Sequence, residues 1–457
     1  MDDTPEPRAN PEPEVHRLRG RALDRQILSL AVPALGALVA EPVFVLVDSA
    51  MVGHLGTAQL AGLSLASTIL TTAVGIFIFL AYATTAATAR RVGAGDRSGA
   101  ITAGVDGMWL ALLLGVATAV ALMVTAPLLV SGAPPDVVPH AVDYLRYSAP
   151  GLVGMLLVLA ATGTLRGLLD TRTPFVVAVS GALANIGFNA LFIYGVGMGV
   201  AGSGLGTAVT QTGMALWLIA VLLRRARGLD IALRPRRSGI WASARAGVPL
   251  LIRTLTLRVA ILVTIAVATS LGAVTLAAHQ VVTAMFGLAA FALDALAIAA
   301  QALVGQSLGA GDPHHVRALL RRCLQWGVIG GALLGVVIAA GGWWLAPLFT
   351  GDDDVRLAAA VGLAVLGVTL PVGGWVFVLD GVLIGAGDGR FLAWAGLINL
   401  VAYLPMAGLV LAFAPDGAAG LAWLWVAFGG GFMLARAVTN GVRARGTRWM
   451  VLGAERT

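Results

Sequence analysis

The feature that most constrains the fold is a series of long apolar segments that occupies most of the chain. Of the 457 residues, 58% are hydrophobic and only 12% are charged, and the mean hydropathy is +0.89. An α-helix needs about 20 apolar residues to cross a bilayer, and it satisfies its backbone hydrogen bonds internally. We therefore predict an all-α integral membrane protein with about twelve spans. The predicted spans are 27–51, 61–89, 100–126, 141–163, 174–196, 204–223, 247–271, 276–306, 319–348, 357–386, 391–413 and 419–440.

Arginines gather in every second connection between these spans, and only Arg356, beside the acidic residues 352–354, breaks the pattern. Arg90, Arg91 and Arg97 follow the second span, whereas the turns at 53–59 and 131–140 contain none. Positively charged loops stay on the cytoplasmic side, so this alternation predicts a multi-pass protein of the bacterial cytoplasmic membrane with both termini cytoplasmic. The net charge of +7 comes from arginines spread over these short loops and not from one basic patch. We therefore expect the lipid bilayer as a partner and no nucleic acid.

The two halves of the chain repeat each other with a constant offset. The sequence GAGD at 93–96 recurs at 309–312, and the Leu-Gly pair at 55–56 recurs at 271–272, both 216 residues later. Six spans per repeat is an even number, so both copies enter the membrane in the same orientation. The repeat predicts two six-helix lobes related by a pseudo-two-fold axis along the membrane normal, with a site near mid-membrane.

The first sixteen residues are rich in proline and charge and lack apolar content, which is typical of a disordered tail and not of a signal peptide. The expected organisation is a disordered cytoplasmic tail, an N-lobe, an inter-lobe linker on the cytoplasmic side, a C-lobe and a second cytoplasmic tail. Their predicted bounds are 1–26, 27–224, 225–246, 247–442 and 443–457.

One acidic residue, Asp48, lies near the end of the first predicted span. Ionisable groups at membrane depth cost roughly 2.5–3.5 kcal/mol on insertion scales and usually mark ion or proton paths. Glu41 lies seven residues earlier on the same helix face, and Asn185 and Asn189 lie four residues apart on the fifth span, where their amides can hydrogen-bond a carboxylate. Two plainer explanations stay open: Asp48 caps a helix end, and the asparagines join helices by hydrogen bonds.

Four charged residues lie within the predicted spans of the second half. Counted from the cytoplasmic ends of their spans, Arg258 and Asp294 lie some 16–18 Å deep, and Arg253 and Asp380 lie roughly 9 Å deep, at ~1.5 Å per residue. Opposite charges at equal depth predict an Arg258–Asp294 pair and an Arg253–Asp380 pair. Both a structural ion-pair cluster and a proton site fit this pattern.

No motif of enzyme chemistry accompanies these residues. Cys323 is the single cysteine, and the chain has no P-loop, no His/Cys metal-ligand spacing and no Ser–His–Asp arrangement. The three GAGD sequences match the GxGD of intramembrane aspartyl proteases, but they lie at span ends and no Tyr-Asp partner precedes them. We predict no enzyme, no catalytic residue, no metal and no cofactor, with a membrane-embedded enzyme as a remote alternative.

Four stretches together carry a family resemblance: LVDSAMVGHLG (46–56), TLRGLLDTRTP (164–174), ALDALAIAAQALVGQSLGAGD (292–312) and VLDGVLIGAGD (378–388). With them the chain resembles the multidrug and toxin extrusion (MATE) transporters, and most of all their DNA-damage-inducible (DinF) branch. The resemblance covers about residues 28–449. It implies a V of two six-helix lobes around a cavity and cation-coupled export of organic substrates.

The resemblance also implies roles for the polar residues of the first lobe. Asp48 matches the first-helix carboxylate of the branch, which takes the coupling proton or sodium ion, and Asn185 matches an asparagine of the fifth helix. The branch usually has aspartate where this chain has Asn189, so one of two carboxylates is replaced by a neutral amide. This departure leaves Glu41 as the candidate for a second acid.

Four more residues match family positions. Thr207 and Gln211 match or neighbour polar positions of the cavity, and Asp294 and Asp380 match carboxylates of the second lobe. The predicted function is export of amphipathic or cationic compounds in exchange for protons, switched by protonation of Asp48, with Na⁺ as the alternative coupling ion. A flippase for lipid-linked precursors is the alternative function. We expect a monomer whose partners are the bilayer and small organic substrates.

Overall fold

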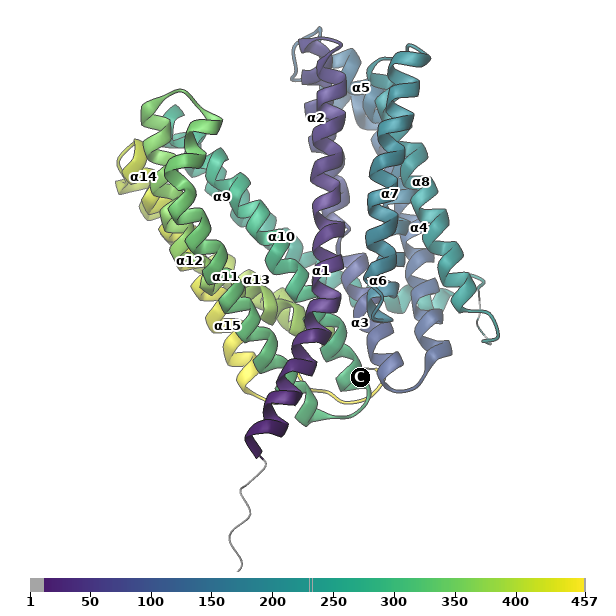
Figure 1. Cartoon of the computed structure of the whole chain (residues 1–457). Helices are drawn as coiled ribbons and strands as arrows, with labels where there is room; N and C mark the ends of the chain where they lie inside the picture. Colours follow the sequence, from purple (N-terminus) through teal and green to yellow (C-terminus); the bar gives the residue numbers. More distant parts are fainter. Residues whose placement is uncertain (1–11, 230, 232, 456–457) are drawn as a thin grey trace, which may run out of the picture.

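The computed structural model describes residues 12–229, 231 and 233–455, and in this part of the chain every regular element is a helix (Figure 1). Two of the elements, η1 and η2, are π-helices. The elements are α1 (Glu12–Gly53), α2 (Thr57–Ile76), α3 (Phe79–Gly93), α4 (Arg97–Leu129), α5 (Val138–Ser148), α6 (Gly151–Gly167), α7 (Arg172–Asn189), η1 (Ala190–Gly195), α8 (Val200–Arg225), α9 (Arg237–Ser270), α10 (Ala273–Gly309), α11 (Pro313–Phe349), α12 (Asp353–Gly385), α13 (Gly389–Phe413), α14 (Gly417–Trp425), η2 (Val426–Phe432) and α15 (Met433–Arg445).

The predicted all-α membrane fold is confirmed. Eleven helices are long and apolar enough to cross a membrane, and the pair α5 and α6, bent by 52°, makes up to twelve. Three spans are interrupted helices: α2 and α3 meet at 77–78, η1 continues α7, and η2 joins α14 to α15. The observed helices extend a few residues beyond most of the predicted spans, because helical hydrogen bonding continues into the polar caps where hydropathy has already fallen.

The expectation of a disordered tail over 1–26 is wrong for residues 12–26, which form the first turns of α1; residues 1–11 lie outside the described residues. After Pro13 no proline interrupts the chain until Pro33, so nothing in the sequence breaks the helix there. Asp24 then anchors this segment on α11. Its carboxylate accepts hydrogen bonds from Arg322 (2.5 Å to each oxygen) and from Trp326 Nε1 (2.7 Å).

The helices form two lobes that make a V (Figure 1). One lobe contains α1–α8 and the other α9–α15. The lobes diverge toward the end of the molecule that holds the α1–α2 and α9–α10 turns, which we name the arginine-poor end. They approach each other at the opposite, arginine-rich end, where α3 passes into α4, α10 into α11 and α12 into α13.

The internal repeat reappears as a symmetric contact between the lobes at the arginine-rich end. A Cβ added to Gly93 of α3 would lie 1.9 Å from the Gln306 carbonyl oxygen of α10, and a Cβ added to Gly309 would lie 1.9 Å from that of Arg90. Both partners obey the offset of the repeat, since 309 − 93 and 306 − 90 are both 216. The pseudo-two-fold axis therefore passes between α3 and α10, where only glycine allows so close an approach.

We predict that Gly309→Ala separates the lobes at the arginine-rich end, because the added methyl group meets the backbone of α3 and not a flexible side chain. Spin labels at positions 132 and 351, in the open turns after α4 and α11, should report a shorter distance as the V narrows at the arginine-poor end. Gly287→Ala on the same helix is the matched control, since no atom of a described residue lies within 4 Å of its added Cβ. Identical distances in both variants would contradict the prediction.

The segment after α15 lies across this contact between the lobes. Arg90 of α3 donates to the carbonyl oxygens of Val451 (2.7 Å) and Gly453 (2.9 Å), and the Gly453 N–H donates to the Leu308 carbonyl oxygen of α10 (2.9 Å). The Trp449 side chain is fully buried. The C-terminal segment thus joins both lobes at the arginine-rich end.

Candidate functional site

Asp48 of α1 lies at the centre of a buried polar cluster in the first lobe. Its side chain is 4% exposed and faces α7 and α8. Asn189 Nδ2 donates to Asp48 Oδ1 at 2.9 Å, and Ser203 Oγ donates to the same oxygen at 2.5 Å. Three helices of one lobe therefore converge on a single carboxylate.

The two asparagines of α7 form one unit, as their spacing predicts. Asn189 Nδ2 also donates to Asn185 Oδ1 at 2.9 Å, and both side chains are buried. The π-helix η1 begins directly after Asn189, and such local widening of a helix is frequent at functional sites. On the facing helix, Gly206 lets the backbone of α8 approach Asn189, because an added Cβ would lie 2.0 Å from Asn189 Oδ1.

The Asp48 carboxylate differs from the other buried carboxylates in its partners. Arginines pair with Asp106, Asp380 and Asp388, whereas no described basic side chain lies within ion-pair distance of Asp48. Both of its hydrogen bonds go to Oδ1, and Oδ2 accepts none from the described residues. An ionised carboxylate without a counter-charge is costly to bury, so this one is poised to take up a proton or a cation.

The remaining residues predicted for this site lie around it but outside the hydrogen-bonded cluster. Glu41 is exposed and lies two turns from Asp48 along α1, about 10 Å at the helical rise, so the structure does not bring the two acids together. Thr207 is buried one turn from Ser203 on α8. Gln211 lies a turn further on, where its backbone packs against Gly154 of α6.

Ser203 is a site residue that the sequence analysis missed. It lies in the small-residue stretch AGSGLG, directly before the predicted start of the sixth span. Serine is common at helix interfaces, so the residue type alone gave no signal. The spacing of Ser203 and Thr207 could have served as a signal, because positions four apart share a helix face and Thr207 was a predicted site residue.

The second lobe holds a separate charge cluster around Asp380 of α12. Its Oδ2 accepts hydrogen bonds from Arg253 of α9 (2.5 Å) and from Arg436 of α15, and Oδ1 accepts one from Asn440 Nδ2 (2.7 Å). The predicted Arg253–Asp380 pair is therefore present. Arg436 and Asn440 are additions, although an arginine within the twelfth predicted span was itself a signal.

The predicted Arg258–Asp294 pair does not form. The structure shows neither a hydrogen bond nor an ion pair between these two described side chains. Arg258 lies five residues after Arg253, which is about 140° around the helix, so equal depth does not place it on the same face. It points instead toward Gly75 of α2, whose added Cβ would lie 2.6 Å from Arg258 Nη2.

Asp294 of α10 lies near the Asp380 cluster. Arg253 and Arg436 act on it electrostatically, and so does Arg166 of α6, an arginine of the first lobe. Ion pairs in this cluster join Arg253 and Arg436 to Asp380 and tie three helices together, which is the pattern of a structural network. Asp294 makes no ion pair with a described residue.

The repeat places a different pair at the position in the second lobe that corresponds to Asp48. The offset of 216 leads from Asp48 to Thr264, and the offset of 218 between Asp170 and Asp388 leads from Asn185 to Tyr403. These two side chains hydrogen-bond each other at 2.6 Å. The symmetric fold therefore has a carboxylate at this position in one lobe only.

We predict that Gly206→Ala disrupts the cluster, because the added methyl group overlaps Asn189 Oδ1 and forces the amide away from Asp48. Overpacking of this kind costs roughly 1–3 kcal/mol, which should lower the Tm in detergent and weaken transport. Gly213→Ala on the same helix is the matched control, since nothing lies within 4 Å of its added Cβ. Equal Tm and equal transport in the two variants would contradict the geometry.

Comparisons with known proteins agree with this architecture. The MatE family model matches residues 33–191 and 249–409, one segment in each lobe. The chain is 29% identical to Protein DETOXIFICATION 44, chloroplastic, of Arabidopsis thaliana, over 93% of this chain and 84% of that protein. It is 26% identical to the probable multidrug resistance protein NorM of Idiomarina loihiensis, over 92% of this chain and 93% of that protein.

A solved structure shows the same fold. The Vibrio cholerae MATE transporter VcmN in the bent form superposes with a TM-score of 0.84 at 20% identity, covering 95% of this chain and 98% of that one. The family match extends over both lobes and includes most of the chain. The chain is a multi-pass membrane protein that belongs to the MatE family of multidrug efflux transporters, whose members are transporters and not enzymes.

Proposed function

We propose that this protein is a proton-driven antiporter that exports amphipathic, often cationic, organic compounds, with Asp48 as the coupling residue. One observation carries the proposal: Asp48 is buried in the first lobe, is held by neutral donors, and has no described cationic partner. A group of this kind can change its charge during a transport cycle. A carboxylate that is locked to arginine, such as Asp380, cannot do so easily.

The hydrogen bonds suggest how protonation acts on the helix. While Asp48 is ionised, the Asn189 and Ser203 donors bind its charge and hold α1 against α7 and α8. A proton on Oδ2 removes this charge and weakens both bonds. The middle of α1 can then move, because Pro33 and Pro42 lie inside the helix and each removes one backbone hydrogen bond. Movement of α1 would release the substrate as the proton binds.

The ligand set favours a proton over sodium as the coupling ion. A sodium site is a cage of several oxygen atoms, and here the cluster supplies one carboxylate with amide and hydroxyl groups. The Asn189 amide turns its NH₂ group, not its oxygen, toward Asp48. A second carboxylate at position 189 would have favoured a metal cation, and the chain has asparagine there.

The distribution of arginines supports an orientation. We infer that the arginine-rich end faces the cytoplasm of a bacterial cell, that both termini lie there, and that the V opens outward. The motifs around Asp48 and Asp380 favour the DinF branch of the family. We further infer a monomer. The partners of such a protein are the bilayer and its organic substrates.

The choice of coupling ion is tested by imposing one gradient at a time on proteoliposomes that contain the full chain and a fluorescent cationic dye. We expect a pH gradient at symmetric Na⁺ to drive dye efflux. A Na⁺ gradient at symmetric pH should leave the dye in place. Efflux driven by sodium alone would overturn proton coupling, and efflux under neither gradient would overturn the assignment of cationic substrates.

A further inference from the structure

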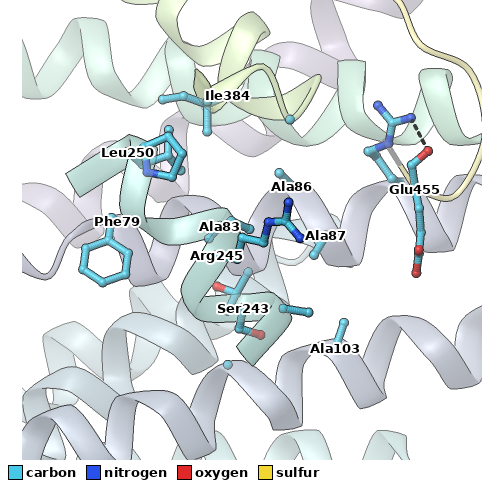
Figure 2. Close-up of a pocket in the computed structure, with 18 of the residues that line it drawn as sticks. Phe79, Ala83, Ala86, Ala87, Ala103, Ser243, Arg245, Leu250, Ile384 and Glu455 are labelled. Atoms are coloured by element: carbon cyan, nitrogen blue, oxygen red, sulfur yellow. Dashed lines mark hydrogen bonds between the residues drawn. The ribbon is translucent and has the colours of Figure 1, made fainter. Parts of the chain in front are cut away.

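A cavity lies away from the Asp48 cluster, at the arginine-rich end of the contact between the lobes. It measures about 1070 Å³ and is enclosed by α3 and α4 of one lobe, by the start of α9 and the α12–α13 turn of the other, and by the C-terminal segment (Figure 2). Its size is that of a site for a ligand much larger than a simple ion. The transport mechanism proposed for Asp48 does not use it.

The charge of this cavity is strongly positive. Six arginines and three carboxylates line it. Each carboxylate is already paired with one of the arginines: Asp106 with Arg236 (2.5 Å), Asp388 with Arg443 (2.7 Å), and Glu455 with Arg91. The three carboxylates thus neutralise three of the six arginines, and the lining keeps a formal excess of three positive charges.

Two of the arginines are available to a ligand. Arg245 of α9 and Arg390 of α13 are exposed side chains that make no hydrogen bond or ion pair with any described residue. Figure 2 shows Arg245 extending toward Ala86 and Ala87 of α3, so its guanidinium lies along the lining of the cavity. An anion bound at Arg245 would therefore touch both lobes.

The start of α13 adds to the positive potential. Both α9 and α13 begin at the cavity, where Ser238 and Gly389 line it. The first turn of α9 already has the Asp106 carboxylate against it, since a Cβ added to Gly239 would lie 2.1 Å from Asp106 Oδ2. The capping residue of α13 makes no side-chain cap hydrogen bond. At α13 the capping residue Asp388 is instead bound by Arg443. N–H groups at a helix start favour a phosphate-like anion, and at α13 they reinforce the two arginines.

The other half of the cavity is apolar. Phe79, Leu250 and Ile384 lie on one side of Arg245 in Figure 2, and Glu455 lies on the other. Trp394, which also lines the cavity, is 68% exposed at the molecular surface. Exposed tryptophans concentrate at the level of lipid headgroups, so the opening of the cavity is at the interface of the membrane.

We propose that this cavity binds the phosphate of an amphipathic phosphate ester, with the headgroup at Arg245 and Arg390 and the apolar part along Phe79 and Leu250. An anionic phospholipid of the cytoplasmic leaflet has this chemistry, and a soluble organic phosphate shares its headgroup. The ligand contacts both lobes at the end where they meet. It therefore favours the conformation in which the arginine-rich end is closed, because it binds that state more tightly than the open one.

The test uses native mass spectrometry of the full chain titrated with phosphatidylglycerol. We expect Arg245→Gln combined with Arg390→Gln to weaken binding about tenfold or more, since each arginine near an anionic headgroup contributes about one kcal/mol. The matched control is Arg317→Gln combined with Arg321→Gln, two exposed arginines of α11 outside the cavity that likewise make no hydrogen bond with a described residue. This control variant should bind as the wild type does.

Further titrations separate the sources of the ligand. Phosphatidylcholine should bind weakly because its headgroup has no net charge, and glycerol 1-phosphate should compete only weakly because it lacks the apolar part. Strong competition by glycerol 1-phosphate, lost in the cavity variant, would support the same anion site with a soluble ligand. Equal binding of phosphatidylglycerol to the cavity variant, the control variant and the wild type would overturn the proposal.

Discussion

Asp48→Asn should reduce proton-driven efflux to the level of protein-free vesicles. The substitution keeps the shape of the side chain, and its amide oxygen can still accept hydrogen bonds from Asn189 and Ser203, so the fold should survive. It removes the group that titrates, and α1 then stays permanently in the state that a neutral residue 48 favours. Dye efflux from proteoliposomes under an imposed pH gradient measures the loss, and Tm in detergent verifies that the variant is folded.

Glu41→Gln is the control variant for this transport experiment. Glu41 lies on the same helix but is exposed and outside the hydrogen-bonded cluster. If Asp48 alone couples transport, Glu41→Gln should retain most of the efflux. Normal efflux by the Asp48 variant, together with loss in the Glu41 variant, would move coupling to the exposed acid and contradict our assignment.

Asp380→Asn should have the largest effect on stability. The substitution leaves Arg253 and Arg436, whose side chains are 11% and 7% exposed, without their shared counter-charge. Removing one partner of a buried ion pair typically costs roughly 3–5 kcal/mol, because the remaining charge stays desolvated. We expect poor expression or a strongly lowered Tm, measured by thermal unfolding of the purified protein.

Two further variants distinguish a structural from a coupling role for Asp380. Asp416→Asn, at an exposed turn of the same lobe, should leave the Tm unchanged. Adding Arg253→Gln to Asp380→Asn should recover part of the lost stability, because it removes one of the two unpaired charges. A stable Asp380→Asn protein that fails to transport would show that this carboxylate acts in coupling instead.

Much of the fold could be predicted from the sequence because hydropathy and the repeat both act over long stretches of chain. All twelve predicted segments coincide with observed helices or interrupted helices, and three of them end one residue beyond the helix. The offset of 216 residues, first seen in the GAGD sequences, also predicted two equivalent lobes, and the contacts of Gly93 and Gly309 follow it. The N-terminal helix over 12–26 escaped prediction because its stability comes from the tertiary contact of Asp24 with α11.

The candidate site was only partly predictable, because sequence distance determines depth in the membrane better than direction around a helix. Spacing alone placed Asn185 and Asn189 together, and an unexpected acid drew attention to Asp48. The failed Arg258–Asp294 pair and the missed Ser203 both depend on which way a helix faces, and that is set by packing between helices. In the Asp380 cluster, the pair with Arg253 was predicted and Arg436 was not, since Arg436 lies in a predicted span that was treated as apolar.

The two lobes share a fold and differ in their electrostatics. At equivalent positions one lobe has Asp48 with amides, and the other has a hydroxyl pair formed by Thr264 and Tyr403. The second lobe instead places its carboxylate Asp380 between two arginines. This asymmetry favours a single titrating site in the first lobe. The carboxylate Asp380 of the second lobe stays ionised and paired with its arginines.

Substrate-induced proton release from the purified protein tests the role of Asp48 most directly. If substrate and proton compete through Asp48, adding a cationic dye to the wild type in weakly buffered detergent solution should release protons, detected with a pH indicator. Asp48→Asn should release none, and a separate fluorescence titration establishes that the dye still binds. Equal proton release by the variant and the wild type would contradict the account, because the coupling proton would then reside on another residue.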